Sequence, residues 1–150
     1  MDKISFGSAS YLQAAAFSIR YRVFVLEQKI PPELEFDQHD DELARYFVYF
    51  HNKEAIATIR YQALNENTIQ PDRFCVTKKW RKKGFGKKLL AFYEKQAIKD
   101  GYQRTILSAE LTAIPFYLNS GYQIVSAPYL EDGIWCQKME KILTEVTNGY

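Results

Sequence analysis

Apolar residues recur at helical spacing near the start of the chain. Leu12, Ala15, Ala16, Ile19, Val23 and Leu26 form an i, i+3, i+4, i+7 stripe. The spacing predicts a helix that ends near Glu27, with Ser8 or Ser10 as its cap. Arg20 and Arg22 interrupt the apolar run, which argues against a signal peptide or a membrane span. In a soluble helix we interpret both arginines as exposed residues.

Runs of β-branched and aromatic residues, separated by turn residues, predict the strands. They cover residues 3–6, 44–51, 55–64, 69–77, 105–109, 122–125 and 134–141. Helices are expected over residues 84–100 and 112–120, closed by Gly101 and Gly121. A helix between two strands is typical of a βαβ crossover. The pattern therefore predicts an α+β fold with a mixed, mostly antiparallel sheet of six or seven strands and flanking helices.

The chain length and charge limit the possible classes of protein. With 150 residues and 47% hydrophobic content, residues 1–150 are expected to form a single domain. A net charge of +2 is too small to predict nucleic-acid or membrane binding. Cys75 and Cys136 lie in predicted strands without metal-ligand spacing, so we expect buried thiols and no metal site. The absence of a signal-peptide or membrane-span pattern predicts a cytoplasmic location.

The charges are unevenly distributed along the chain. An acidic run, Glu33, Glu35, Asp37, Asp40, Asp41 and Glu42, occupies a predicted loop. A basic run, Lys78, Lys79, Arg81, Lys82, Lys83, Lys87 and Lys88, surrounds the junction of a strand and a helix. The acidic run suggests a cationic substrate, and the basic run suggests an anionic ligand.

The junction of strand and helix at residues 81–86 is suited to phosphate. The first N–H groups of a helix have no internal partner and carry partial positive charge. Gly84 and Gly86 remove side chains where a diphosphate approaches the backbone. A Walker A loop is excluded because Arg81 and Lys88 stand where it needs Gly and Ser or Thr. A dinucleotide fingerprint fails because Leu89 replaces its third glycine.

With these elements in this order, the chain resembles the GNAT superfamily of acyl-CoA-dependent N-acyltransferases. Arg81-x-x-Gly84-x-Gly86 matches the acyl-CoA pyrophosphate loop of that family. Ala113-x-x-Phe116-Tyr117-x-x-x-Gly121-Tyr122 matches its later helix-turn segment. Arg22-Val23-Phe24-Val25-x-Glu27-Gln28, with Glu35, Asp37 and Asp40, is similar to the small bacterial ElaA/YjcF-like branch.

The resemblance implies a GNAT fold that binds acetyl-CoA and uses no metal. Coenzyme A would enter between a strand ending near Val76 and a strand ending near Ser108, where its pantetheine completes the backbone hydrogen bonding. The cofactor-binding residues implied are Phe74, Cys75, Val76, Arg81, Lys82, Lys83, Gly84, Phe85, Gly86, Lys87, Ser108 and Phe116.

The implied reaction is direct attack of an amine on the thioester. Tyr117 matches the family's donor to the CoA sulfur, and Glu110 is the first candidate for the base, ahead of Glu27. Glu110 stands where the branch usually has an amide, and Trp135-Cys136 replaces an expected Pro-His pair. Phe116 and Tyr117 also have a simpler interpretation as core aromatic residues, and Glu110 as a helix-start residue.

Three functions remain open from the sequence. The first is an acetyl-CoA-dependent N-acetyltransferase acting on a primary amine of a small molecule or a protein, with a cationic acceptor favoured by the acidic run. The second is a CoA-binding module without catalysis or with an altered substrate. The third is an acyl-homoserine-lactone-type synthase. For any of them we expect a monomer or homodimer that binds neither nucleic acid nor membrane.

Overall fold

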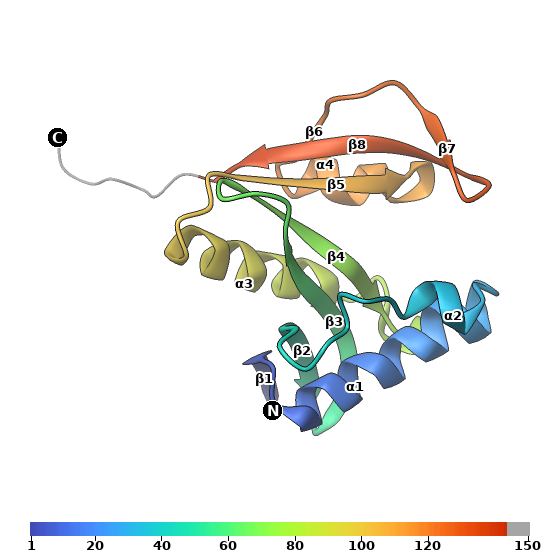
Figure 1. The fold of residues 1–150 in the computed structure, drawn as a ribbon, viewed down its shortest axis with the longest axis vertical. Helices are drawn as coiled ribbons and strands as arrows, with labels where there is room; N and C mark the ends of the chain where they lie inside the picture. The colour runs from blue at the N-terminus through green and yellow to red at the C-terminus, as the bar shows by residue number, and fades with distance from the viewer. Residues whose placement is uncertain (144–150) are drawn as a thin grey trace, which may run out of the picture. The chain divides into compact units, whose positions relative to one another are not determined.

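The computed structural model describes residues 1–143, which form the elements labelled in Figure 1. The chain divides into two compact units. The first comprises Met1–Gln62 and Pro71–Tyr93, and the second comprises Ala63–Gln70 and Glu94–Tyr150. A single domain over residues 1–150 stays a prediction. No helix of the described residues is long and apolar enough to cross a membrane.

Eight strands form one sheet, in the order β1-β2-β3-β4-β5-β8-β6, with β7 paired to β8. The strands are β1 (Asp2–Gly7), β2 (Tyr46–His51), β3 (Glu54–Ala63), β4 (Thr68–Val76), β5 (Arg104–Glu110), β6 (Gln123–Ile124), β7 (Tyr129–Glu131) and β8 (Ile134–Ile142). The described pairs are antiparallel, except that β4 and β5 are parallel and joined by a helix. The mixed, mostly antiparallel α+β fold is confirmed, with one strand more than the largest number expected.

The helices follow the predicted segments closely, except for a short helix at Pro32–Glu35 where a loop was expected; Pro32 stands in its first turn, where the missing N–H of proline costs no helical hydrogen bond. They are α1 (Ser10–Arg20), a π-helix (Tyr21–Glu27), α2 (Pro32–Glu35), α3 (Phe85–Lys99) and α4 (Ile114–Asn119), with 3-10 turns at Lys78–Trp80 and Leu111–Ala113. The first helix ends at Glu27 as expected, but its last seven residues are a π-helix. The predicted serine cap was wrong, because the N-cap of α1 is Ala9 and makes no side-chain cap bond.

Glycines close α3 and α4, as the sequence predicts. Gly101 has φ 89°, and the N–H of Tyr102 donates to the carbonyl of Ala97 at 3.0 Å. Gly121 has φ 91°, and the N–H of Tyr122 donates to the carbonyl of Tyr117 at 3.0 Å. Both ends are Schellman motifs, in which a left-handed residue turns the chain back over the last helical carbonyls.

In the first unit, β2 is buried on both faces. Tyr46 and Val48 pack with Leu12, Ala16 and Ile19 of α1. The alternate residue Phe47 lies 6.0 Å from the ring of Tyr93 on α3, and Tyr49 lies 5.2 Å from that of Phe85. Because successive strand residues point to opposite faces, α1 and the first part of α3 cover opposite sides of β2.

In the second unit, Glu94 connects α3 to two other segments. Its carboxylate accepts hydrogen bonds from the hydroxyl of Tyr122 at 2.8 Å and from the Lys141 ammonium at 2.7 Å. Lys141 also donates to the carbonyl of Ser120 at 2.9 Å, next to the end of α4. These bonds satisfy a buried carboxylate and tie α3 and the end of α4 to β8.

Candidate active site

The basic loop before α3 has the backbone of an anion site. Lys82 and Gly84 have φ values of 60° and 88°, so the loop turns twice through the left-handed region before α3 begins at Phe85. Successive N–H groups in such turns form a concave nest for anions. Lys82, Lys83 and Lys87 are exposed, and among residues 1–143 they make no ion pair with a carboxylate. The loop therefore offers N–H groups and free cations together.

Two residues of the predicted phosphate loop have additional structural roles. The ring of Phe85 is buried against Tyr49, His51 and Trp80, so only its backbone is available to a ligand. The Arg81 guanidinium donates to the carbonyl of Val76 at 2.8 Å and to the Glu27 carboxylate at 2.7 Å. Hydrogen bonding to Arg81 lowers the pKa of Glu27, which weakens Glu27 as a candidate base.

Strand β4 carries a left-handed residue, Arg73 with φ 53°, directly before the predicted pantetheine segment. A non-glycine residue in this region costs about 1–3 kcal/mol and persists only where its surroundings hold it. The N–H of Arg73 donates to Asp72 at 3.1 Å, and its guanidinium donates to the carbonyl of Glu35 at 3.1 Å and to Asp37 at 3.2 Å. These contacts stabilise the local kink in β4.

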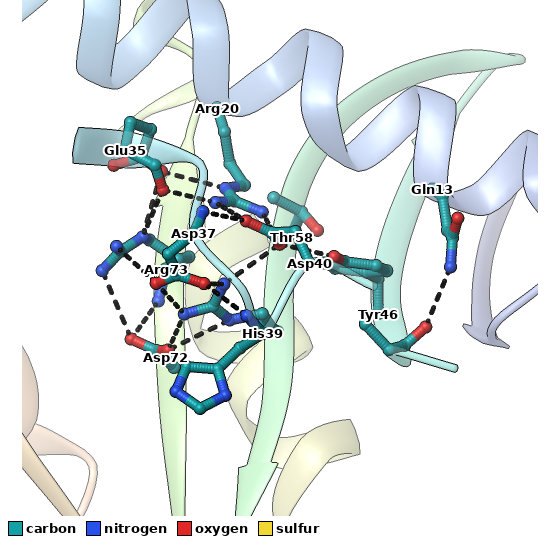
Figure 2. Close-up of polar contacts among 12 residues, drawn as sticks. Gln13, Arg20, Glu35, Asp37, His39, Asp40, Tyr46, Thr58, Asp72 and Arg73 are labelled. Atoms are coloured by element: carbon teal, nitrogen blue, oxygen red, sulfur yellow. Dashed lines mark hydrogen bonds and ion pairs between the residues drawn. The ribbon is translucent and has the colours of Figure 1, made fainter. Parts of the chain in front are cut away.

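The same contacts belong to a larger charge network in the first unit, drawn in Figure 2. Arg20 is fully buried and donates to Glu35 at 2.9 Å and to Asp40 at 2.6 and 2.9 Å. Arg60 is also buried and donates to Asp37 at 2.8 Å. The interpretation of Arg20 as an exposed helix residue was wrong, because its guanidinium neutralises two carboxylates that follow it in the chain. Arg22 is exposed as expected.

The network accounts for part of the acidic run, because some of its carboxylates pair with arginines inside the first unit. Burial alone would raise the pKa of Asp40, but hydrogen bonds from Arg20 and Tyr46 hold it well below the ordinary value. Burial raises the pKa of Glu35 despite the nearby arginines. Glu35, Asp37 and Asp40 are therefore used internally, and the exposed acids left for an external partner are Glu33, Asp41 and Glu42.

In the second unit, Tyr117 lies on α4 with its ring at 5.1 Å from Phe116 and 5.5 Å from Tyr122. Burial raises the pKa of its phenol, and the negative charge of Glu110 raises it further. Glu110 is the last residue of β5 and precedes the 3-10 turn that leads into α4. The candidate acid and the candidate base are thus electrostatically coupled.

Ser108, a predicted cofactor contact, hydrogen bonds with two residues that the sequence interpretation missed. Its hydroxyl contacts the phenol of Tyr129 and donates to Glu131 at 3.1 Å. Tyr129 and Glu131 reach it through a hairpin whose turn, Asp132 and Gly133, has φ values of 49° and 79°. An Asp-Gly pair between short apolar runs is a strong hairpin signal and would have predicted the pairing of β7 with β8, but not the contact with Ser108.

Both cysteines are free and buried, as expected. Burial raises the pKa of the Cys75 thiol and of the Cys136 thiol, so each stays protonated and unreactive near neutral pH. Among the described residues, no group of three or more His, Cys, Asp and Glu side chains is placed to hold a metal ion.

Comparisons with known proteins give one consistent result. A family model described as an acetyltransferase (GNAT) domain matches residues 12–143. The uncharacterized N-acetyltransferase YjcF of Bacillus subtilis is 32% identical over 120 residues, which cover 79% of this chain and 84% of YjcF. The crystal structure of a putative N-acetyltransferase from Lactobacillus plantarum has a TM-score of 0.92 at 33% identity, and the match covers 95% of this chain and 99% of that chain.

Two less similar structures share the fold. Escherichia coli ElaA has a TM-score of 0.80 at 22% identity, covering 94% of this chain and 99% of ElaA. BjaI, a CoA-dependent acyl-homoserine lactone synthase solved with SAM and isopentyl-CoA, has a TM-score of 0.80 at 14% identity, covering 96% of this chain and 84% of BjaI. At these identities the likeness concerns the fold alone.

Proposed function

The chain belongs to the GNAT acetyltransferase family, and from that premise we propose that it transfers an acetyl group from acetyl-CoA to a primary amine of a small molecule. The main structural support for acetyl-CoA as the cofactor is the loop at residues 81–86. It combines two left-handed residues, the N-terminus of α3 and exposed lysines without carboxylate partners among the described residues. That combination suits a diphosphate bound through backbone N–H groups.

The remaining cofactor contacts follow from the resemblance and stay proposals. Phe74, Cys75 and Val76 would offer backbone groups to pantetheine, with Ser108 and Phe116 as further contacts. In the second unit, the parallel ladder of β4 and β5 pairs Thr68 with Arg104 and Ile69 with Thr105, so the described pairing engages only the start of each strand. The two unpaired cysteines are consistent with a reducing, cytoplasmic location.

In the proposed mechanism, a neutral amine attacks the thioester carbonyl. The C–N bond forms, the C–S bond breaks, and the electron pair leaves on sulfur. Tyr117 donates a hydrogen bond to that sulfur, and Glu110 receives the amine proton and passes it to water. The exposed acids of the acidic run, Glu33, Asp41 and Glu42, favour a cationic acceptor.

Calorimetry with CoA and with acetyl-CoA tests this proposal. We expect a dissociation constant between about 1 µM and 1 mM, the range common for enzyme substrates. Thiol release from acetyl-CoA should depend on added amine. Absence of any CoA binding would rule the proposal out. Binding without thiol release across an amine panel would instead indicate a CoA-binding module, the alternative suggested by Glu110 and Trp135.

Two glycines give a matched pair of variants for the phosphate loop. Gly84 and Gly101 have φ values of 88° and 89°, and a Cβ on either would meet no atom within 4 Å. Alanine at each should cost a similar ~1–2 kcal/mol of stability through backbone strain. Only Gly84→Ala places a methyl group where the diphosphate approaches. We expect it to weaken CoA binding about tenfold, a change of ~1.4 kcal/mol.

Gly101→Ala serves as the control because it lies at the other end of the same helix. Its CoA affinity should stay within about twofold of the starting protein, after correction for the folded fraction measured by thermal melting. Equal weakening in both variants would mean that strain alone explains the loss and that the loop is not the diphosphate site.

A further inference from the structure

One face of the second unit gathers polar side chains from β5, β7 and β8. Cys136 of β8 pairs with Glu110 on β5 and with Tyr129 on β7. Side chains of paired residues lie on the same face of a sheet, and residues two apart on a strand share that face. Ser108 and Glu131 therefore lie on the same face as Glu110 and Tyr129.

The donor and the acceptor can be assigned in each hydrogen bond of Ser108 on this face. Ser108 donates its single hydroxyl proton to Oε2 of Glu131 at 3.1 Å, so in its contact with Tyr129 the phenol must be the donor. The chain of donors runs from Tyr129 through Ser108 to Glu131. Among the described residues no donor reaches Oε1 of Glu131, and Glu131 is exposed. The carboxylate is thus oriented through one oxygen while the other is available to a ligand.

This face of the sheet also includes Glu110, the candidate base of the proposed reaction. Glu110 is electrostatically coupled to Tyr117 and sits one strand from β8 and two strands from β7. Ser108, which Glu131 contacts, lies two residues from Glu110 on the same face of β5, a spacing of ~7 Å that a short diamine can span. Lys138 pairs with Ser108 and is exposed on the same face, but among the described residues it forms no ion pair with Glu131.

The two carboxylates suit two different nitrogens. The attacking amine must be neutral, and a carboxylate that binds an ammonium raises the pKa of that ammonium and opposes attack. Glu131 accepts a hydrogen bond from the Ser108 hydroxyl, which in turn contacts the Tyr129 phenol, and it suits a charged nitrogen that does not react. Glu110, whose negative charge adds to the effect of burial in raising the pKa of the Tyr117 phenol, suits the nitrogen that loses its proton.

We propose that Glu131, oriented by Ser108 and Tyr129, binds the second ammonium of the acceptor, so that the acceptor is a small aliphatic diamine. The proposal rests on the acetyltransferase function proposed above and names the substrate class for the same site. One nitrogen is acetylated near Tyr117 and Glu110 while the other stays charged against Glu131.

Steady-state kinetics with a four-carbon diamine and with butylamine test the proposal at saturating acetyl-CoA. A hydrogen bond between charged groups contributes ~1.5–3 kcal/mol, so kcat/KM for the diamine should exceed that for butylamine by about 10-fold or more. Glu131→Gln should reduce this preference about tenfold, mainly through the KM of the diamine. Tyr129→Phe and Ser108→Ala should reduce it less, because they loosen the carboxylate without removing it.

Asp132→Asn is the matched control, because it removes the same charge one residue away at an exposed turn position that asparagine tolerates. It should leave the preference between the two amines unchanged. Equal use of both amines, no acetylation of the diamine, or a Glu131→Gln variant with the original preference would each overturn the diamine proposal while CoA binding persists. Loss of CoA binding in the starting protein would overturn the acetyltransferase proposal instead.

Discussion

Tyr117→Phe should lower kcat about 10- to 100-fold while the dissociation constant of CoA changes less than about twofold. The expected magnitude follows from the raised pKa of the Tyr117 phenol, which makes it a weaker acid than an ordinary thiol. A weaker acid does not hand over its proton before the C–S bond breaks. It stabilises the developing thiolate by donating a hydrogen bond, which for a charged acceptor contributes about 1.5–3 kcal/mol.

Tyr122→Phe provides the control for this variant. Tyr122 lies against Tyr117 with ring centroids 5.5 Å apart, but its hydroxyl donates to Glu94 inside the second unit. Loss of that hydroxyl should lower the melting temperature and leave kcat within about twofold once the folded fraction is accounted for. If Tyr122→Phe and Tyr117→Phe lose the same activity, the effect comes from packing around α4 and Tyr117 is not the donor.

The pH dependence of kcat gives an independent measurement. Burial and Glu110 raise the pKa of Tyr117, so the phenol keeps its proton as the pH rises to the ordinary tyrosine value of about 10. Tyr117 should therefore cause no fall in kcat below about pH 10. A kcat that declines with an apparent pKa well below 10, and loses that decline in Tyr117→Phe, would contradict the burial of the phenol.

Local signals in the sequence predicted most of the fold. Gly101 and Gly121 mark helix ends through their backbone freedom, and the apolar stripe of residues 12–26 marks the first helix. These features depend on residues close in the chain, so a single sequence is sufficient to find them. The phosphate loop is local in the same way, because its glycines, lysines and helix start are contiguous.

Features that depend on distant partners were missed. Arg20 is buried because Glu35 and Asp40, 15 and 20 residues later, fold back over it, and nothing within the helix indicates that. Glu131 and Tyr129 meet Ser108 because of sheet register, which spacing along the chain does not reveal. The Asp132-Gly133 turn was the one local signal for that register, and it implies a hairpin and not a function.

Arg20→Met should destabilise the protein by about 3–5 kcal/mol, because it leaves Glu35 and Asp40 buried without their main countercharge. Total stabilities of folded domains are about 5–15 kcal/mol, so the variant loses a large share of its stability. For a chain of this size the melting temperature should fall by roughly 6–20 °C. Methionine keeps much of the side-chain volume, so a cavity contributes little to the loss.

Arg22→Met is the matched control, since Arg22 lies two residues away on the same helical segment and is exposed, and within residues 1–143 its only hydrogen bonds are 3.4 Å contacts to backbone carbonyls. Its stability should change by no more than about 0.5 kcal/mol. A similar loss in both variants would assign the effect to the helix and not to the buried charges.

The combined variant Arg20→Met, Glu35→Gln and Asp40→Asn separates charge from packing. Neutral partners no longer need a buried countercharge, so the triple variant should regain part of the stability that Arg20→Met loses. The network also holds Arg73 in its left-handed conformation through Glu35 and Asp37. Arg20→Met should therefore weaken CoA binding beyond its effect on folding, because the backbone of β4 next to Phe74 loses its support. Unchanged CoA affinity in the folded fraction would show that the network stabilises the fold without positioning the cofactor site.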